Sequence, residues 1–272
     1  MNHYSRVRPD DWGQDGVDTD VPNVARMYDY YLGGLHNFPA DREMAQRVVG
    51  AYPSLPAILK LNRAFLRRAV KYLAKAGIRQ FVDLGSGLPT VGNVHEIAQS
   101  VDPEAHVVYV DIDPTAVLHS RLMLVGNPYA TVLQMDLRQP ELVLNHRDLR
   151  WQIDLDQPVA ILAVSVLHFM TDADNPQGLM KTYGSVLAPG SCIAISHASH
   201  DMEPEQSEKV MQLYARSGNP MRFRTHDEIA GLFGGFPLVE PGLSILDDWH
   251  PELSEDSLPR LDIGYCGVAR KK

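Results

Sequence analysis

Short apolar runs alternate with segments of helical spacing through most of the chain. Residues 80–84 form the first run, which stops at a glycine loop, and residues 92–100 read as a helix that begins with the capping pair Asn93 and Glu96. Further strands are expected at 106–110, 130–134, 159–166, 191–196, 238–239 and 263–269, and further helices at 114–125, 176–187, 205–217 and 225–233. This alternation predicts an α/β fold with a mostly parallel sheet, helices on both faces and an antiparallel edge.

The N-terminal region has a different character. Residues 1–20 are polar and are interpreted as a flexible tail, whereas residues 21–60 contain helical segments that are interrupted by Gly33-Gly34 and by two prolines. Residues 62–76 have the apolar spacing of an amphipathic helix, which Gly77 ends. We therefore expect a main domain over residues 61–272 and an N-terminal helical cap over residues 21–60.

The cap needs a partner surface for its larger side chains, Tyr28, Tyr31, Leu32 and Phe38. We expect it to fold over the ligand crevice as a lid, with Asn37, Asp41 and Arg42 on a segment that faces the site. The alternative is a cap that packs on the far side of the sheet and serves stability alone.

Composition narrows the choice of partner. A length of 272 residues and an apolar fraction of 44% are enough for one large α/β domain. The formal charge of −9 disfavours a protein that binds a nucleic-acid backbone, because such proteins usually carry a basic face. The basic residues within 63–71 are interpreted as the solvated face of a helix. A small-molecule partner is therefore expected.

Cysteine content and hydropathy predict a cytoplasmic protein that does not enter the membrane. Cys192 and Cys266 lie in apolar runs and are too few for a disulfide framework or a zinc site, so no metal is expected. Residues 1–20 lack the apolar stretch of a signal peptide. The longest apolar run, residues 159–170, is too short to span a bilayer.

The most informative segment is the glycine loop after the first strand. Asp83 ends the strand, and Gly85 and Gly87 allow a tight turn on which a ligand can lie against bare backbone. A dinucleotide-binding loop would have a third glycine at Thr90 to bring a helix N-terminus close to a pyrophosphate. Asp83 suits a cationic ligand such as S-adenosylmethionine (SAM) better than an anionic one. The alternative is that Asp83 caps backbone amides of the loop.

Two more carboxylates follow the next two strands. Asp111 can accept hydrogen bonds from both hydroxyls of a ribose, and Asp136 can accept one from an adenine amino group. Asp113, which precedes Pro114, is expected to cap the following helix. Because ligands of open α/β sheets bind at the carboxyl ends of the strands, the acids that follow the first three strands are expected to line one crevice.

Longer motifs give the chain a family resemblance. It resembles class I SAM-dependent methyltransferases, and in particular an actinobacterial S-adenosyl methyltransferase family that was long a domain of unknown function. The resemblance covers residues 18–271 and is carried by residues 25–34 (ARMYDYYLGG), 37–42 (NFPADR), 62–66 (NRAFL), 80–90 (QFVDLGSGLPT), 93–96 (NVHE), 110–114 (VDIDP), 166–169 (VLHF) and 196–198 (SHA). It implies a Rossmann-like fold with a central seven-stranded sheet, SAM as the cofactor, and methyl transfer to an acceptor that the sequence does not identify.

The resemblance also implies cofactor contacts for individual residues. Asp83, Gly85 and Gly87 would line the methionine end, Asp111 would bind the ribose, and Asp136 with Leu137 would bind the adenine. Ile112 and Ser165 are included among the cofactor-binding residues. Arg63 is a candidate to bind the SAM carboxylate through two parallel hydrogen bonds from its guanidinium group. The alternative is that Arg63 is a surface arginine. One departure concerns Leu35-His36, where the family usually has Lys-Asp.

The catalytic candidates are His168, His95 and Tyr31. Methyl transfer depends mainly on alignment, and a base is needed only where the acceptor carries a proton at attack. His168 follows the fourth strand and His95 begins a helix, so each is either a base or a hydrogen-bonded structural histidine, and His197 is interpreted as structural. Tyr31 belongs to a tyrosine cluster that forms either an aromatic lid or core packing.

Two other functions stay open at this point. A non-catalytic regulatory module that binds SAM would have the same cofactor residues. An NAD(P)-dependent oxidoreductase is disfavoured by Asp83 and by Thr90 in place of the third glycine.

Overall fold

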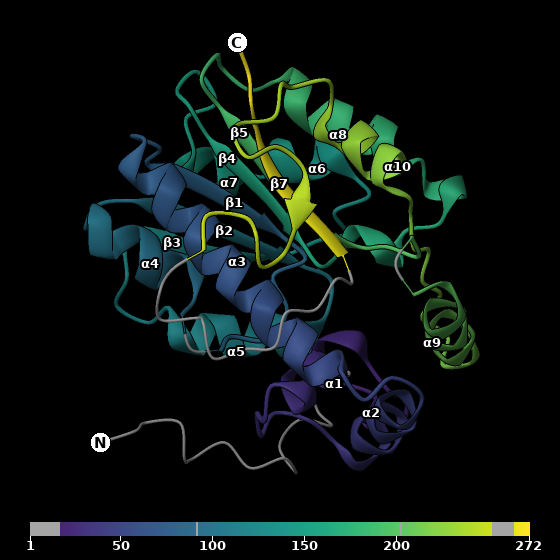
Figure 1. Cartoon of the computed structure of the whole chain (residues 1–272). Coiled ribbons are helices and arrows are strands. Elements are labelled where there is room, and N and C mark those ends of the chain that lie inside the picture. The colour runs from purple at the N-terminus through teal and green to yellow at the C-terminus, as the bar shows by residue number, and fades with distance from the viewer. Residues whose placement is uncertain (1–16, 91, 202, 252–263) are drawn as a thin grey trace.

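A seven-stranded sheet forms the centre of the described structure (Figure 1). The structure is a computed structural model that describes residues 17–90, 92–201, 203–251 and 264–272. The strand order is β3-β2-β1-β4-β5-β7-β6. The bounds are Gln80–Leu84 for β1, His106–Asp111 for β2, Ala130–Gln134 for β3, Ala160–Val164 for β4, Cys192–Ala198 for β5, Ser244–Ile245 for β6 and Gly264–Arg270 for β7.

Strands β1 to β5 are parallel, and β7 pairs antiparallel with both β5 and β6. Alternate residues of each strand point to opposite faces of the sheet, which explains why the strands are apolar throughout. Phe81 packs into the core on one face and Val82 into the core on the other. The predicted α/β fold, with its mostly parallel sheet and antiparallel edge, is confirmed.

Helices cover both faces of the sheet (Figure 1). One core contains residues of α3 (Leu55–Lys75), α4 (Val94–Val101) and α5 (Pro114–Met123). The other contains residues of α6 (Pro140–Leu144), α7 (Arg147–Gln152), α8 (Pro176–Ser185) and α10 (His226–Ala230). Within the described ranges, no helix combines the length and the hydropathy needed to cross a bilayer.

The N-terminal helices α1 (Val24–Tyr31) and α2 (Pro39–Ala51) gather with α9 (Pro204–Arg216) beside the first half of α3 (Figure 1). A buried ion pair between Arg26 Nε and Asp41 Oδ2, 2.8 Å apart, joins α1 to α2. Asp41 also accepts hydrogen bonds from the backbone amides of Asn23 and Phe38. The turn between the two helices is therefore fixed by buried charge rather than by apolar contact alone.

Several expected bounds differ from those observed. α3 begins at Leu55 rather than at residue 62, because a proline in the first helical turn gives up only an amide that has no intrahelical partner. Residues 238–239 do not form a strand: Leu238 makes one isolated bridge to Ala269, and the edge strand is β6. The helices α6 and α7 were not predicted. Most of the expected tail, residues 1–16, lies outside the described residues, as does residue 263 of the expected last strand.

Candidate functional site

A cleft of about 470 Å³ opens at the carboxyl ends of β1, β2, β3 and β4. All the residues expected to bind the cofactor line this one cleft: Arg63, Asp83, Gly85, Gly87, Asp111, Ile112, Asp136, Leu137 and Ser165. The pairing of β2 with both β1 and β3 explains why the three acids meet. Helix α1 also borders the cleft, through Val24, Ala25 and Tyr28.

The glycine loop needs both of its glycines. Gly85 and Gly87 have φ values of 69° and 66°, a left-handed conformation that other residues rarely adopt. A Cβ atom on Gly85 would lie 2.3 Å from Val166 Cγ2, whereas a Cβ atom on Gly87 would meet nothing within 4 Å. Gly85 therefore allows close packing against Val166, and Gly87 leaves open space above the backbone of the loop.

Asp83 is buried at the floor of the cleft and is 6% exposed. Burial, with a smaller contribution from Asp111, raises the pKa of Asp83 to about 7, although the nearby Arg63 guanidinium opposes the shift. Arg63 donates a hydrogen bond to Gly92 O at 2.9 Å. The described residues donate no hydrogen bond to the Asp83 carboxyl group, so the loop-capping alternative is wrong and the group is free to face a ligand.

Asp111 holds the glycine loop in place. Its carboxylate accepts the amide hydrogen of Gly87 at 2.7 Å and that of Asp113 at 2.9 Å. Burial raises the pKa of Asp111 to about 6, and these backbone bonds oppose the shift. Asp113 accepts the Thr115 amide at 2.8 Å and caps α5 as predicted.

The far end of the cleft is more exposed. The Ile112 side chain is 59% exposed at the rim, an unusual position for a large apolar residue that a bound ring would cover. Asp136 accepts hydrogen bonds from Arg138, at 3.0 Å from Nε and 2.7 Å from Nη2, and this pairing lowers the pKa of Asp136. Arg138 therefore competes with any ligand amino group for the same carboxylate.

These features fit SAM. A buried acid without a hydrogen-bond donor suits the ammonium and sulfonium groups, the space above Gly87 admits the methionine chain, and Ile112 can cover one face of the adenine. A phosphate would instead lie beside Asp83, where a buried carboxylate repels it.

A second and smaller cavity, the inner chamber, adjoins the cleft. Its volume is about 90 Å³, and it shares with the cleft the residues Val24, Tyr28, Asn62, Ser165 and Phe169. Helices α1, α3 and α9 and the end of β5 enclose it. Among the described residues that line the chamber there is no Asp, Glu, Lys or Arg.

A chain of neutral hydrogen bonds crosses the border between the two cavities. The Ser196 hydroxyl donates to Asn62 Oδ1 at 2.5 Å, and Asn62 Nδ2 donates to the Tyr28 hydroxyl at 3.0 Å. The Ser165 amide donates to Ser196 Oγ at 3.0 Å while Ser165 itself has a φ of 60°. A non-glycine residue in this conformation costs about 1–3 kcal/mol, and such strain is common at functional sites.

His168 lies in the chamber wall and is buried. Its Nδ1 accepts the Ala198 amide hydrogen at 3.5 Å, and its Nε2 has no partner among the described residues. Burial, together with His197 and Arg224, holds the pKa of His168 well below its usual range. His168 is therefore neutral near pH 7, and the long contact of its Nδ1 with the Ala198 amide favours the tautomer with the ring proton on Nε2.

His197 is a structural histidine, as expected. Its Nδ1 donates to Ala198 O at 2.7 Å, and its Nε2 accepts from the buried Arg224 at 3.1 Å. Burial lowers the pKa of His197 to about 3. Arg224 also donates to Leu167 O and Met170 O, so it fixes the segment that carries His168.

The other two catalytic candidates, like His168, do not line the cofactor cleft. His95 is buried against Tyr109, whose hydroxyl lies 2.8 Å from His95 Nδ1, and it lines none of the described cavities. Its position corresponds to the structural alternative. Tyr31 lines the inner chamber and a surface cavity on the cap, but not the cofactor cleft.

The expected lid segment also differs from the structure. Asn37, Asp41 and Arg42 do not line the cleft. Asn37 instead donates to Asp29 at 2.8 Å and accepts from Arg42 at 3.0 Å, so it holds the turn after α1. The part of the cap that reaches the cleft is α1 together with its N-cap residue Asn23.

Sequence reasoning missed several residues around the chamber. Asn62 and Ser196 stood in the motifs that carry the resemblance, but their contact spans 134 positions. Tyr214 and Arg224 lie in segments without a recognisable motif. No local pattern could have connected these residues, since their proximity depends on how α3, α9 and β5 pack.

Comparison with known proteins agrees with this geometry. A protein of the DUF574 family from Streptomyces avermitilis has 39% identity, covers 94% of this chain and 99% of its own, and superposes with a TM-score of 0.90. A methyltransferase candidate from Thermobifida fusca has 41% identity, with 96% and 99% of the two chains covered and the same TM-score. A SAM-dependent methyltransferase from Mesorhizobium loti, at 16% identity and a TM-score of 0.51 over 75% of this chain and 96% of its own, shares the fold.

Among curated proteins, none matches the sequence. The sequence profile of the S-adenosyl methyltransferase family matches residues 10–272, nearly the whole chain. The resemblance seen in the motifs is thus confirmed, as is SAM as the cofactor, and the chain belongs to the S-adenosyl methyltransferase family.

Proposed function

We propose that this SAM-dependent methyltransferase acts on a small, uncharged acceptor that binds in the inner chamber. The observation that carries the proposal is the chamber itself, which adjoins the cofactor cleft and has no charged side chain among its described lining residues. Placing an ion in such a space without a partner charge costs several kcal/mol or more. Aromatic and apolar side chains instead favour a neutral molecule.

In the cleft, Asp83 would face the cationic end of SAM, and Arg63 would lie close enough to approach its carboxylate. Gly85 and Gly87 would shape the loop beneath the methionine chain. These roles agree with the shape and charge of the cleft.

The remaining cofactor contacts lie at the ends of the second and third strands. Asp111 would accept from the ribose with the lone pairs that its two backbone bonds leave available. Asp136 and Leu137, with Ile112 at the rim, would surround the adenine, and Ser165 would lie at the boundary with the acceptor.

SAM supplies an electrophilic methyl group when it is bound. The protein's contribution is to hold the acceptor in line with that group and to exclude water, and both effects can account for a large part of the rate. His168, with a proton on Nε2, would donate a hydrogen bond to the acceptor and orient it. The Ser196–Asn62–Tyr28 chain would fix the chamber border at which the two molecules meet.

A nucleic-acid acceptor is not part of this proposal, because the formal charge of −9 disfavours binding to a phosphate backbone. We also propose a cytoplasmic location, since the thiols of Cys192 and Cys266 are both free and buried.

The experiment is to measure S-adenosylhomocysteine formation with a panel of neutral phenols, anilines and indoles, each paired with a carboxylated or sulfonated analogue. We expect turnover with neutral members and little or none with their charged partners. Turnover restricted to charged compounds would contradict the proposal. If the protein binds SAM and no small molecule is methylated, the regulatory module becomes the better account.

A further inference from the structure

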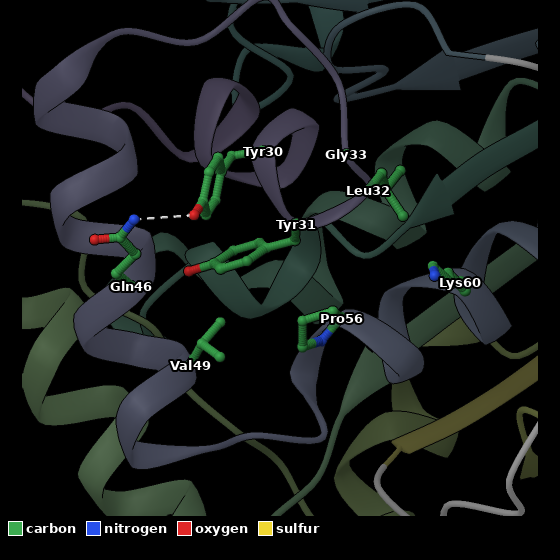
Figure 2. Close-up of a pocket in the computed structure, with 8 residues that line it drawn as sticks. All are labelled: Tyr30, Tyr31, Leu32, Gly33, Gln46, Val49, Pro56 and Lys60. Carbon is green, nitrogen blue, oxygen red and sulfur yellow. Dashed lines mark hydrogen bonds between the residues drawn. The ribbon is translucent and has the colours of Figure 1, made fainter.

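A third cavity, here called the outer cavity, opens on the surface of the N-terminal cap (Figure 2). Its volume is about 450 Å³, and its lining residues come from α1, α2 and the start of α3. Tyr30, Val49 and Pro56 give it apolar walls, and Gln46 and Lys60 stand at its exposed edges. Nothing in the cofactor chemistry requires this cavity.

Tyr31 connects the outer cavity to the inner chamber, because its side chain lines both. Figure 2 shows its ring lying between Tyr30 and Pro56, on the floor of the outer cavity. The Tyr31 side chain is 6% exposed and is therefore packed in the protein interior. The partition between the two cavities is therefore formed in part by one aromatic ring.

Apolar packing and one long polar contact hold the Tyr31 ring in the partition. The Tyr31 hydroxyl lies 3.3 Å from that of Tyr214, longer than the usual 2.7–2.8 Å of a hydroxyl pair. Tyr31 is also the last residue of α1, and Gly33 follows with a φ of 82°. Rotation of the Tyr31 ring therefore costs one long hydrogen bond and the apolar packing of the ring, which an entering aromatic ligand can replace.

The size of the inner chamber requires such a movement. At about 90 Å³ it is smaller than the roughly 150 Å³ apolar cavity that admits benzene in other proteins. An aromatic acceptor can therefore enter only if a wall yields. Five wall residues border the cofactor cleft, whereas Tyr31 is the described wall residue that also lines the outer cavity.

We propose that the outer cavity is the entrance and outer half of the acceptor site, with Tyr31 as the gate. The ligand is an elongated, uncharged aromatic molecule whose nucleophilic end occupies the inner chamber. Its outer half carries hydrogen-bond acceptors that the Gln46 amide or the Lys60 ammonium group can reach. This inference rests on the proposed function for the identity of the chamber, and it adds that acceptor and cofactor enter by different routes.

The test uses the neutral fluorophore 6-propionyl-2-(dimethylamino)naphthalene, whose emission shifts to shorter wavelength in apolar surroundings. Its association with the full chain is followed by stopped-flow fluorescence, with and without saturating S-adenosylhomocysteine. We expect the association rate to change by less than twofold when the cofactor cleft is filled. Loss of association in the presence of S-adenosylhomocysteine would place the entrance in the cleft and overturn the proposal.

Two variants test the gate and the entrance directly. Gln46→Trp fills the outer cavity and should slow association at least fivefold, and Tyr31→Ala should accelerate it at least tenfold. Arg47→Trp, an exposed neighbour on α2 that does not line the cavity, is the matched control and should behave as the wild type. An unchanged rate in Gln46→Trp overturns the entrance even if Tyr31→Ala does not fold.

These experiments distinguish a failure of the outer cavity as the entrance from a failure of the proposed function. SAM affinity, measured by calorimetry, should be the same in Gln46→Trp, Arg47→Trp and the wild type, since neither residue lines the cofactor cleft. Gated binding of the fluorophore without methylation of any small molecule would leave the entrance in place and refute the acceptor assignment. Failure of the fluorophore to bind both the wild type and Tyr31→Ala would refute the entrance itself.

Discussion

The buried carboxyl group of Asp83 should make SAM binding depend on pH. Without ligand its pKa is about 7, because burial penalises the charged form more than Arg63 favours it. A bound cation reverses that balance and favours the carboxylate. Binding below pH 7 must therefore release a proton from Asp83, and the affinity for SAM should rise as the pH rises through 7.

The size of the effect follows from the fraction of protein that is already ionised. With a pKa of about 7, about one carboxyl in ten is charged at pH 6 and about three in four at pH 7.5. The Kd for SAM should thus fall about eightfold over this range, or ~1.2 kcal/mol. The α-amino group of SAM stays largely protonated up to pH 7.5, which limits its own contribution.

Stability should show the opposite dependence in the ligand-free protein. The native pKa of Asp83 is raised above its unfolded value of 3.8, so the native state binds the additional proton between about pH 4 and pH 7. The contribution of Asp83 to the free energy of unfolding is most favourable below this window and is lost as the pH rises through it. Asp83→Asn removes the penalty and should melt at a higher temperature than the wild type at pH 7.5, while binding SAM more weakly.

Calorimetry from pH 6 to 7.5, in buffers of different ionisation enthalpy, measures both the affinity and the proton released. Asp83→Asn should keep only the roughly twofold rise in affinity that Asp111, with a pKa of about 6, contributes over this range. Asp136→Asn is the control, because Arg138 keeps that carboxylate ionised over the whole range and its loss should leave the pH profile intact. A wild-type affinity that does not change with pH, or a profile that survives in Asp83→Asn, would refute the reasoning.

Four further predictions concern individual parts of the site. Asp111→Ala should weaken SAM binding at least about tenfold by calorimetry, since charge-assisted hydrogen bonds contribute about 1.5–3 kcal/mol each; unchanged affinity would exclude the ribose assignment. Gly87→Ala should weaken SAM binding and lower the Tm through backbone strain alone, whereas Gly85→Ala should lower the Tm further because its Cβ also overlaps Val166, and equal Tm values would contradict this. With an acceptor from the panel, His168→Ala should raise KM about fivefold and His168→Gln should restore much of it; no change in KM excludes an orienting role. Removal of divalent ions with a chelator should leave turnover unchanged, and loss restored by a metal would show a metal requirement.

The cofactor cleft could be predicted because the relevant rule acts on strands one at a time. A carboxylate at the end of a parallel strand reaches the same edge as those of its neighbours, whatever lies between them in sequence. Asp83, Asp111 and Asp136 each end or follow a short apolar run, so local pattern was enough to place them together. The parallel strands β1 to β5 and the antiparallel strand β7 followed from the same alternation, whereas β6 was not predicted and the count of seven came from the family resemblance.

The inner chamber could not be predicted in this way. Tyr31 and Tyr214 are separated by 183 positions, and Arg224 reaches Leu167 across 57. The position of the turn between α1 and α2 was also predicted incorrectly. The Asn37 side chain donates a hydrogen bond to Asp29 and the Phe38 amide donates one to Asp41, so this segment packs within the cap and does not face the cleft. Periodicity reports which face of an element is apolar, but it does not report which other element covers that face.

The cofactor cleft and the inner chamber differ in their electrostatic character. On the cofactor side, a buried acid and a nearby guanidinium lie where a ligand with both charges must bind, and burial makes each interaction strong. In the inner chamber, which we propose to hold the acceptor, neutral histidines, hydroxyls and an amide can provide hydrogen bonds without a net charge. A charged group in the chamber would be attracted to or repelled by the sulfonium and would move the acceptor out of line. The absence of charged residues from the described chamber wall therefore favours an acceptor positioned by shape and hydrogen bonds, while the proposed role of Asp83 is to attract the cofactor.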